Sequence, residues 1–366
     1  MGNHTALKTC LAVLPLLMGC GAGADKAPDE TVLVFNGMSD ASAGVFLTAD
    51  RFVVADDESN SLRIYAMDQP STPCAAYDIS GFLRTTVLNP EADIEGAARA
   101  GDRIYWITSH GRNKDGKERP NRYRFFATDI RRDGSDIGLV PAGRPCNDLV
   151  PALLQAPFAR ALGLHEAVRL GENLKKKDRE KLAPKDEGLN IEALAATADG
   201  KVLYIGFRNP RPAHPVTGRR QALVVPMTNG KEVIDLGRRP QFGQPILWDM
   251  GGLGLRSMDY CPAHKAFFLT AGSHDEGNEC VLYRWSGDPD ETPMAIQRLK
   301  DFAPEALMPA PDGKRLLLLS DDGSRPVRIS HPSECLPGEL IDDRTCQNKH
   351  LADPAKKTFR AVYVVP

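Results

Sequence analysis

One pattern of apolar and polar positions recurs five times along the chain. Each copy has a short strand-like run, a polar turn, and a more apolar run that ends in a polar residue. The second copy joins Asp93-Ile-Glu-Gly-Ala-Ala-Arg through a turn to Arg103-Ile-Tyr-Trp-Ile-Thr-Ser-His110. The five copies are Ala43–Tyr65, Asp93–Ile130, Asn190–Met227, Ser257–Trp285 and Pro304–Ile329.

Apolar strands of this length, divided by Asp-Gly-type turns, are typical of antiparallel meanders. A single small sheet cannot bury both of its faces, and radial stacking of repeated sheets gives a β-propeller. We therefore predict an all-β fold, a propeller of five clear blades, with a sixth left open in the irregular stretches. The strand-like segments Thr31–Phe35 and Phe359–Val365 are expected to pair within one blade and close the ring.

Two regions interrupt the repeat. Residues 148–185 have a helical composition and are expected to form a helical insertion between the second and third blades, with their lysines on a solvated face. Residues 331–357 are expected to form a loop held by a disulfide. Neither has the character of an independent domain, so residues 31–366 are predicted to form one propeller domain.

The N-terminal residues indicate where the protein is located. Lys8 precedes an apolar run that is too short to span a bilayer and that ends in Leu17-Met18-Gly19-Cys20. This layout predicts a secretory signal with a bacterial lipobox over residues 1–20, followed by a linker over 21–30. Lipid on Cys20 would anchor the mature chain, and Gly21 favours the periplasmic side of the outer membrane. The alternative is an ordinary signal peptide with a chance cysteine.

The overall composition is that of a globular protein. Hydrophobic residues make up 42%, charged residues 26%, and the formal net charge is −2, which gives no basic face for nucleic acid. We expect a monomer that contacts the membrane only through its lipid. The chain has no Gly-x-Ser-x-Gly elbow, His-Glu-x-x-His, phosphate-binding loop or dinucleotide fingerprint.

Export changes what the cysteines imply. Six remain outside the signal and lipobox, and an even number in an oxidising compartment predicts disulfides. The pairs expected are Cys335–Cys346, Cys261–Cys280 and Cys74–Cys146, although six cysteines allow 15 pairings. A zinc site is the alternative, and the chain has no Cys-x-x-Cys pair to favour it.

The repeat also positions chemically active side chains. The start of one strand and the end of its antiparallel neighbour lie at the same sheet edge. Carboxylates at first-strand starts and polar groups at second-strand ends are therefore expected at one mouth of the central channel, with Asp93, Asn190 and Asp56 nearby. The two sets are Glu95, Glu192, Asp259 and Glu305, and His110, Arg208, His274 and Asp321.

Crowded carboxylates need a cation or basic partners, because each raises the pKa of its neighbours. One solution is a hard cation such as Ca²⁺, which takes six to eight oxygen ligands. The other is direct pairing with Arg112, Arg208 and the two histidines. Loop cations on the same side could bind a phosphate or carboxylate; they are Arg112, Lys114, Arg119, Arg122, Arg211, Arg219 and Arg220. The structural alternative is that these groups only lock neighbouring blades together.

Several sequence blocks resemble a bacterial family of exported propeller proteins of unknown function. They are Asp93-Ile-Glu-Gly-Ala-Ala, Thr108-Ser-His-Gly-Arg-Asn-Lys-Asp-Gly-Lys, Pro184-Lys-Asp-Glu-Gly-Leu-Asn-Ile-Glu-Ala-Leu, Ile205-Gly-Phe-Arg-Asn-Pro and Gly251-Gly-Leu-Gly-Leu-Arg-Ser-Met-Asp. That family is in turn similar to esterase-like phytase propellers, whose Asp-x-Glu-Gly opening matches Asp93–Gly96. The third blade departs from it with Ile191-Glu-Ala, and the fourth with Ser257-Met-Asp.

Two functions remain open. The first is a metal-assisted hydrolase of a phosphate or other anionic ester. Its metal ligands would be Glu95, Glu192, Glu305, Asp93 and Asp259, its anion clamps Arg112, Arg208 and Arg122, and its proton carrier His110 or His274. The second is a non-catalytic surface propeller that binds a small anionic ligand or a partner in the cell envelope.

Overall fold

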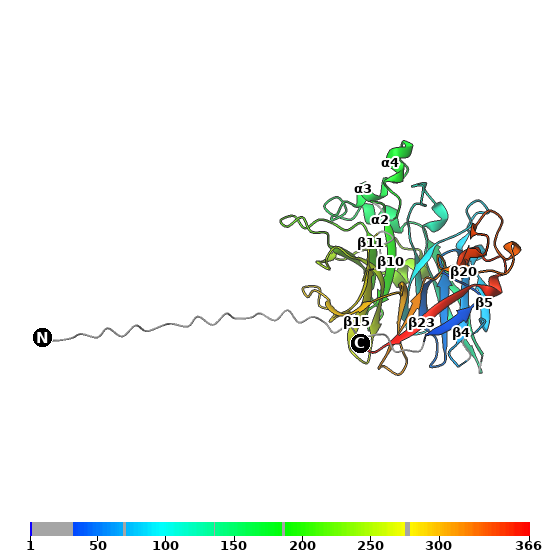
Figure 1. Cartoon of the computed structure of the whole chain (residues 1–366). Helices are drawn as coiled ribbons and strands as arrows, with labels where there is room; N and C mark the ends of the chain where they lie inside the picture. Colours follow the sequence, from blue (N-terminus) through cyan, green and yellow to red (C-terminus); the bar gives the residue numbers. More distant parts are fainter. Residues whose placement is uncertain (2–31, 69–70, 135, 185–186, 275–278) are drawn as a thin grey trace.

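The computed structural model describes all residues except 2–31, 69–70, 135, 185–186 and 275–278. The predicted signal, Cys20 and the linker lie outside the described residues. Five four-stranded antiparallel sheets form within the described residues, each with its strands side by side. The innermost strands of the five sheets contact one another in a closed cycle, which makes the fold a five-bladed propeller (Figure 1).

The blades follow the chain in order. Blade 1 is β2 (Ala41–Phe46), β3 (Arg51–Asp56), β4 (Ser59–Ala66) and β5 (Ala75–Asp78); blade 2 is β6 (Ile94–Ala100), β7 (Arg103–Thr108), β8 (Phe125–Asp133) and β9 (Asp136–Cys146). Blade 3 is β10 (Asn190–Ala196), β11 (Leu203–Asn209), β12 (Ala222–Met227) and β13 (Ile246–Trp248); blade 4 is β14 (Gly254–Cys261), β15 (Ala266–Gly272), β16 (Cys280–Trp285) and β17 (Met294–Leu299).

Blade 5 joins the two ends of the chain. It contains β18 (Pro304–Pro309), β19 (Leu316–Ser320), β23 (Thr358–Val364) and β1 (Leu33–Asn36), and β1 pairs antiparallel with β23. Phe35 of β1 stacks on Phe359 of β23 and meets Phe52 and Tyr65 of blade 1 edge-on. This aromatic cluster confirms the predicted closure and fastens the last blade to the first.

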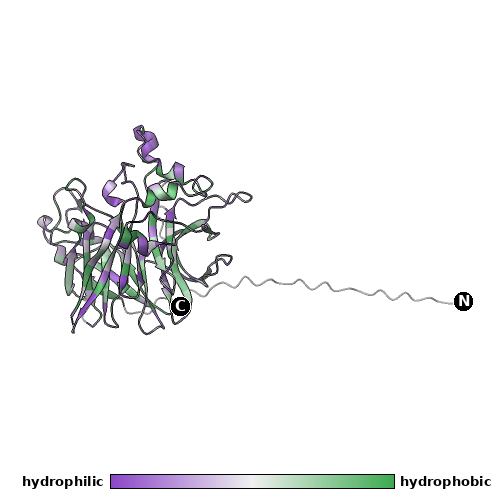
Figure 2. Cartoon of the chain, turned by 180° about the vertical axis from the view of Figure 1, so that it is seen from behind, coloured by the Kyte–Doolittle hydropathy of each residue, from purple (hydrophilic) through white to green (hydrophobic). Residues whose placement is uncertain are grey.

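The apolar cores lie between blades. Strands β10, β11 and β15 are buried at every position, as expected of strands covered on both faces. Five of the apolar clusters each fill the space between two adjacent blades. Figure 2 shows the same distribution, with hydrophobic strands in the body and hydrophilic loops around it.

The helical insertion between blades 2 and 3 is confirmed. Helices α2 (Leu149–Leu154), α3 (Leu164–Val168) and α4 (Lys176–Glu180) lie together beyond β10 and β11 (Figure 1). Leu149, Leu153 and Leu164 enter the core between those blades, whereas α4 buries no residue. The remaining helices are short: α1 (Ser80–Leu83), α5 (Gly230–Leu236) and four 3-10 turns, Pro120–Arg122, Pro332–Glu334, Asn348–His350 and Pro354–Lys356.

A small sheet occupies the segment between β19 and β23. It contains β20 (Pro326–Arg328), β21 (Leu340–Asp342) and β22 (Thr345–Gln347). The Cys335–Cys346 disulfide holds this segment, as predicted. The other two predicted disulfides are wrong, because Cys74, Cys146, Cys261 and Cys280 are free thiols.

The length of β15 explains the error for one of these pairs. Cys261 pairs in register with Ala266 at one end of β15, and Cys280 pairs with Gly272 at the other. Six residues of extended strand separate the two positions by roughly 20 Å. A disulfide needs Cα atoms no more than about 7 Å apart.

Candidate functional site: the acidic mouth of the channel

The innermost strand of every blade carries a β-bulge at the same place. The register shifts at Ser42 in β2, Glu95 in β6, Glu192 in β10, Arg256 in β14 and Glu305 in β18. A bulge leaves one residue unpaired and re-aims its side chain. The five bulges therefore place one hydroxyl, three carboxylates and one guanidinium around the channel. We call the channel end where these strands begin the acidic mouth.

Arginines neutralise two of the three bulge carboxylates. Arg256 bonds both Glu192, at 3.3 Å, and Glu305. Arg208, at the end of β11, bonds Glu192 Oε1 at 2.8 Å. Arg256 thus links the bulge residues of blades 3, 4 and 5, and burial keeps water from screening the three charges.

A second carboxylate cluster includes Glu95 and is only partly neutralised by arginines. One carboxylate oxygen each from Asp57, Asp93 and Glu95 lies within 4.8 Å of the other two, and Asp40, Asp56 and Asp57 meet the same criterion. Asp57 belongs to both groups. We call these five residues the Asp57 cluster. Arg122 pairs with Asp93 at 2.7 Å and also with Glu91, and Arg63 pairs with Asp56 at 3.1 Å.

Asp57 has an unused ligand atom. Its Oδ1 is buried and has no hydrogen-bond partner among the described residues. Burial and the neighbouring Asp40 and Glu95 carboxylates raise the pKa of Asp57 well above its ordinary value. Burial together with Asp93, Glu192 and Glu305 raises the pKa of Glu95 in the same way. Oxygen ligands at this density, one of them unpartnered, fit a hard divalent cation.

The backbone leaves room for this cluster at Gly323. A Cβ on Gly323 would lie 1.6 Å from Asp40 Oδ1, so a side chain there would displace the carboxylate. Asp40 and Asp321 form an isolated bridge at the same point. Burial and the Asp321 charge both raise the pKa of Asp40.

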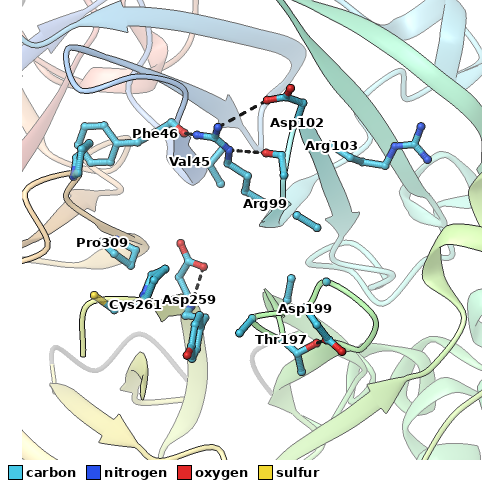
Figure 3. Close-up of a pocket in the computed structure, with 18 of the residues that line it drawn as sticks. Val45, Phe46, Arg99, Asp102, Arg103, Thr197, Asp199, Asp259, Cys261 and Pro309 are labelled. Atoms are coloured by element: carbon cyan, nitrogen blue, oxygen red, sulfur yellow. Dashed lines mark hydrogen bonds and ion pairs between the residues drawn. The ribbon is translucent and has the colours of Figure 1, made fainter. Parts of the chain in front are cut away.

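The structure brings most of the predicted acidic residues together, with one clear exception. Asp93, Glu95, Glu192 and Glu305 lie at the acidic mouth. Asp259 does not, because it sits three residues beyond the bulge of β14, roughly 10 Å further along the strand. It lines a pocket at the opposite end of the channel (Figure 3). Its predicted role as a ligand in the same site is therefore wrong.

Arg112 is also placed differently from the prediction. Its guanidinium bonds Glu118 at 2.9 Å and the carbonyls of Gly116, Val168 and Arg169 at 2.9 to 3.1 Å. It fixes the helical insertion to the loop after β7, so its role as an anion clamp is not supported. Arg208 and Arg122 do lie at the acidic mouth, where Arg208 pairs with Glu192 and Arg122 pairs with Asp93.

The structure shows the surroundings of the two histidines that the sequence offered as proton carriers. His110 is 2% exposed, stacks on Tyr123, and shares a hydrogen bond between its Nδ1 and the Thr108 carbonyl at 2.8 Å. Burial lowers its pKa to about 4, so it is neutral at physiological pH. The backbone carbonyl of His274 accepts a hydrogen bond from Arg208 Nε at 3.1 Å.

The buried His110 predicts an acid-side loss of stability. Its pKa is lower in the folded chain, about 4, than the ordinary 6.5, so unfolding takes up a proton between these pH values. The contribution of His110 to the free energy of unfolding should fall as pH falls from 6.5 to 4, by up to about 3 kcal/mol, whereas carboxyls with a raised pKa contribute with the opposite sign. Urea titrations at several pH values should therefore show the stability of His110→Asn, which keeps a residue tolerant of the positive φ of 52°, rising relative to that of the unaltered protein as pH falls. Equal pH profiles for the two proteins would contradict it.

Three important residues were missed by sequence reasoning. Asp57 and Asp40 lie outside the strand-start pattern, although Asp56-Asp57-Glu58 is a visible acidic run. Arg256 lies one residue before the Ser257-Met-Asp segment that was aligned with the other openings. Aligning Leu255-Arg256-Ser257 with Ile94-Glu95-Gly96 would have placed Arg256 correctly.

Comparisons with known proteins leave the activity open. The family described as "Protein of unknown function (DUF3616)" matches residues 158–315, which span most of the helical insertion, blades 3 and 4, and the start of blade 5. This agrees with the expected resemblance to a family of unknown function. A comparison with curated proteins gave no match.

Among the described residues, no helix has the length and apolar character needed to cross a bilayer.

Solved structures with a similar course of the chain are very distant in sequence. A Thermus thermophilus protein described as a putative glucose dehydrogenase is 11% identical, with a TM-score of 0.41, covering 91% of this chain and 100% of that one. Glutaminyl cyclase of Myxococcus xanthus is 9% identical, with a TM-score of 0.41 and coverage of 79% and 88%. The Cps50 (Swd1) β-propeller domain of Myceliophteria thermophila is 8% identical, with a TM-score of 0.33 and coverage of 79% and 96%. None of these likenesses transfers an activity to this chain.

Proposed function

We propose that the protein binds a divalent cation, Ca²⁺ by the chemistry of the ligands, at the Asp57 cluster. We further propose that it hydrolyses a phosphate ester or a similar anionic ester there. The observation that carries this is the buried Asp57 Oδ1, which has no partner in the described part of the chain and which belongs to the residue common to both groups of carboxylates. The ligands would be Asp40, Asp56, Asp57, Asp93 and Glu95. When bound, Ca²⁺ supplies Lewis acidity toward an ester oxygen.

The protein's own groups would position the anion. Arg122 forms an ion pair with Asp93 of the cluster. Its Nε is buried and has no hydrogen-bond partner among the described residues. It therefore has an N–H to donate to a phosphate oxygen that approaches the cluster.

A second candidate function is binding without turnover. Two residues that the sequence offered for catalysis already have structural contacts, which favours this function. Arg112 bonds Glu118 and backbone carbonyls, and the buried ring of His110 contacts Thr108 and Tyr123. In this case the mouth captures a small anionic ligand or an envelope partner through a bound cation. For both functions we propose that the protein is exported, anchored by lipid on Cys20 at the periplasmic side of the outer membrane, and monomeric.

One experiment separates these functions. Protein purified without chelator should contain stoichiometric calcium by elemental analysis and hydrolyse p-nitrophenyl phosphate, and EGTA should abolish the hydrolysis. Asp57→Asn combined with Glu95→Gln should lose both metal and turnover. Glu172→Gln, an exposed carboxylate on the helical insertion, should retain both. Calcium without turnover would favour the binding function, and absence of calcium would overturn both proposals.

A further inference from the structure

The channel end opposite the acidic mouth is hollowed into a separate pocket. It has a volume of about 1530 Å³ and is lined by the turns that join the two innermost strands of all five blades. We call it the turn-side pocket. Phe46, Arg99, Thr197, Asp259 and Pro309 are lining residues, one from each blade (Figure 3). A cavity of this size can hold a ligand larger than a single ion.

Asp259 breaks the repeat at this pocket. Asp259 lies three residues after the bulge residue of its strand. At the same position in the other four blades the residue is apolar, and each of these residues is 2% exposed or less. They are Val45, Ala98, Ala195 and Met308. Asp259 is partly exposed instead, and Figure 3 shows its carboxylate pointing into the pocket. A polar residue where the fold places an apolar one is a mark of function.

Most of the other charged groups of the wall already have partners. Lys265 also lines the pocket, and it is not among the charges that act on the Asp259 carboxylate. Arg103 pairs with Asp129 at 2.8 Å and with Asp235, and Lys231 also pairs with Asp235. Arg99 donates from Nε to the Gly101 carbonyl at 2.8 Å and from its terminal nitrogen to the Leu47 carbonyl at 3.2 Å.

Asp259 accepts one hydrogen bond, from its neighbour's backbone N–H (Tyr260) at 2.8 Å, and makes no ion pair among the described residues. Burial raises its pKa to about 7, and the more distant Arg99 only partly opposes this. The Asp259 carboxylate therefore lacks an ion-pair partner of opposite charge among the described residues.

An organic cation fits this carboxylate better than a metal ion does. A hard metal ion needs several oxygen ligands, and Asp259 belongs to none of the groups of three or more possible metal ligands among the described residues. An ammonium or guanidinium group needs only one carboxylate. Tyr260 and Phe46 supply aromatic wall surface, over which such a cation also binds favourably.

The geometry points to the turn-side pocket as a second binding site, in which the Asp259 carboxylate pairs with the ammonium or guanidinium group of a small organic cation. This site is independent of the Asp57 cluster, because it lies at the other end of the channel.

Agmatine, which carries both groups, is a suitable probe. Isothermal titration of the full chain should show saturable binding of agmatine and none of 1,4-butanediol, which has the same four-carbon spacer without charge. Asp259→Ala should weaken binding at least about tenfold, and alanine fits because Ala98 and Ala195 occupy the equivalent positions. Glu172→Gln, which removes an exposed carboxylate on the helical insertion, outside the pocket lining, should bind agmatine as the unaltered protein does.

A thermal measurement separates a binding carboxylate from a structural one. Agmatine should raise the midpoint of unfolding of the unaltered protein and not of Asp259→Ala, and without agmatine the variant should melt at the same temperature or higher. Failure of agmatine to bind, equal binding by Asp259→Ala, or a lower melting point of that variant together with unchanged binding would each overturn the proposal. Loss of calcium through Asp57→Asn should leave agmatine binding unchanged.

Discussion

Replacing Arg256 with methionine should lower the free energy of unfolding by about 3–5 kcal/mol, the cost of breaking a buried ion pair by removing one partner. Methionine keeps much of the side-chain volume and removes the charge. Glu192 and Glu305 would then lie together with only Arg208 opposite them. Urea denaturation in EGTA measures the loss without a contribution from bound metal.

Two further variants test the cause of this loss. Arg256→Met combined with Glu305→Gln should recover part of it, because one of the stranded charges is removed. Arg298→Met is the matched control, since Arg298 makes an exposed ion pair with Glu279 in the same blade and should cost less than about 1 kcal/mol. A change below about 1 kcal/mol in Arg256→Met would show that the three charges do not depend on one another.

Asp57→Asn should change stability in opposite directions with and without calcium. In EGTA the variant should be more stable than the unaltered protein by about 1 kcal/mol, because one of several mutually repelling carboxylates is removed. With calcium at about 100 times its dissociation constant, the unaltered protein gains about 2.7 kcal/mol and the variant gains little. The order of the two melting temperatures should therefore reverse when calcium is added.

This reversal distinguishes a cation site from a structural acid cluster. Glu172→Gln removes an exposed carboxylate that is paired with Arg169, and it should respond to calcium as the unaltered protein does. If Asp57→Asn were less stable in both conditions, Asp57 would be accepting hydrogen bonds that the fold needs, and the proposed cation site would be wrong.

The sequence was sufficient to predict the fold because the repeated apolar strands themselves require the sheets to stack. Apolar strands such as Leu316–Ser320 must be covered on both faces, and only neighbouring copies of the same unit can cover them. Closure by β1 and β23 was equally visible, since both terminal segments are strand-like and their pairing completes the last blade of the ring. The convergence of Glu95, Glu192 and Glu305 followed from their equivalent positions in the repeat.

The partners of those residues were decided by the tertiary structure. Arg256 comes from blade 4 and bonds carboxylates of blades 3 and 5, which lie 64 and 49 residues away in the sequence. Strand patterns give the face on which a side chain lies, and they do not give its neighbours in other blades. The free Cys261 and Cys280 show the same limit, because an entire strand separates two cysteines that are close in sequence.

By itself the sequence determined a closed ring of repeated sheets with acidic groups at one end, because burial of apolar strands depends on local periodicity. Only the tertiary structure decided which acids are neutralised, which remain in the Asp57 cluster, and that Asp259 belongs to the other end. The physical reason is the β-bulge: one unpaired residue sets the register of each inner strand, and a difference of three positions moves a side chain from one mouth of the channel to the other.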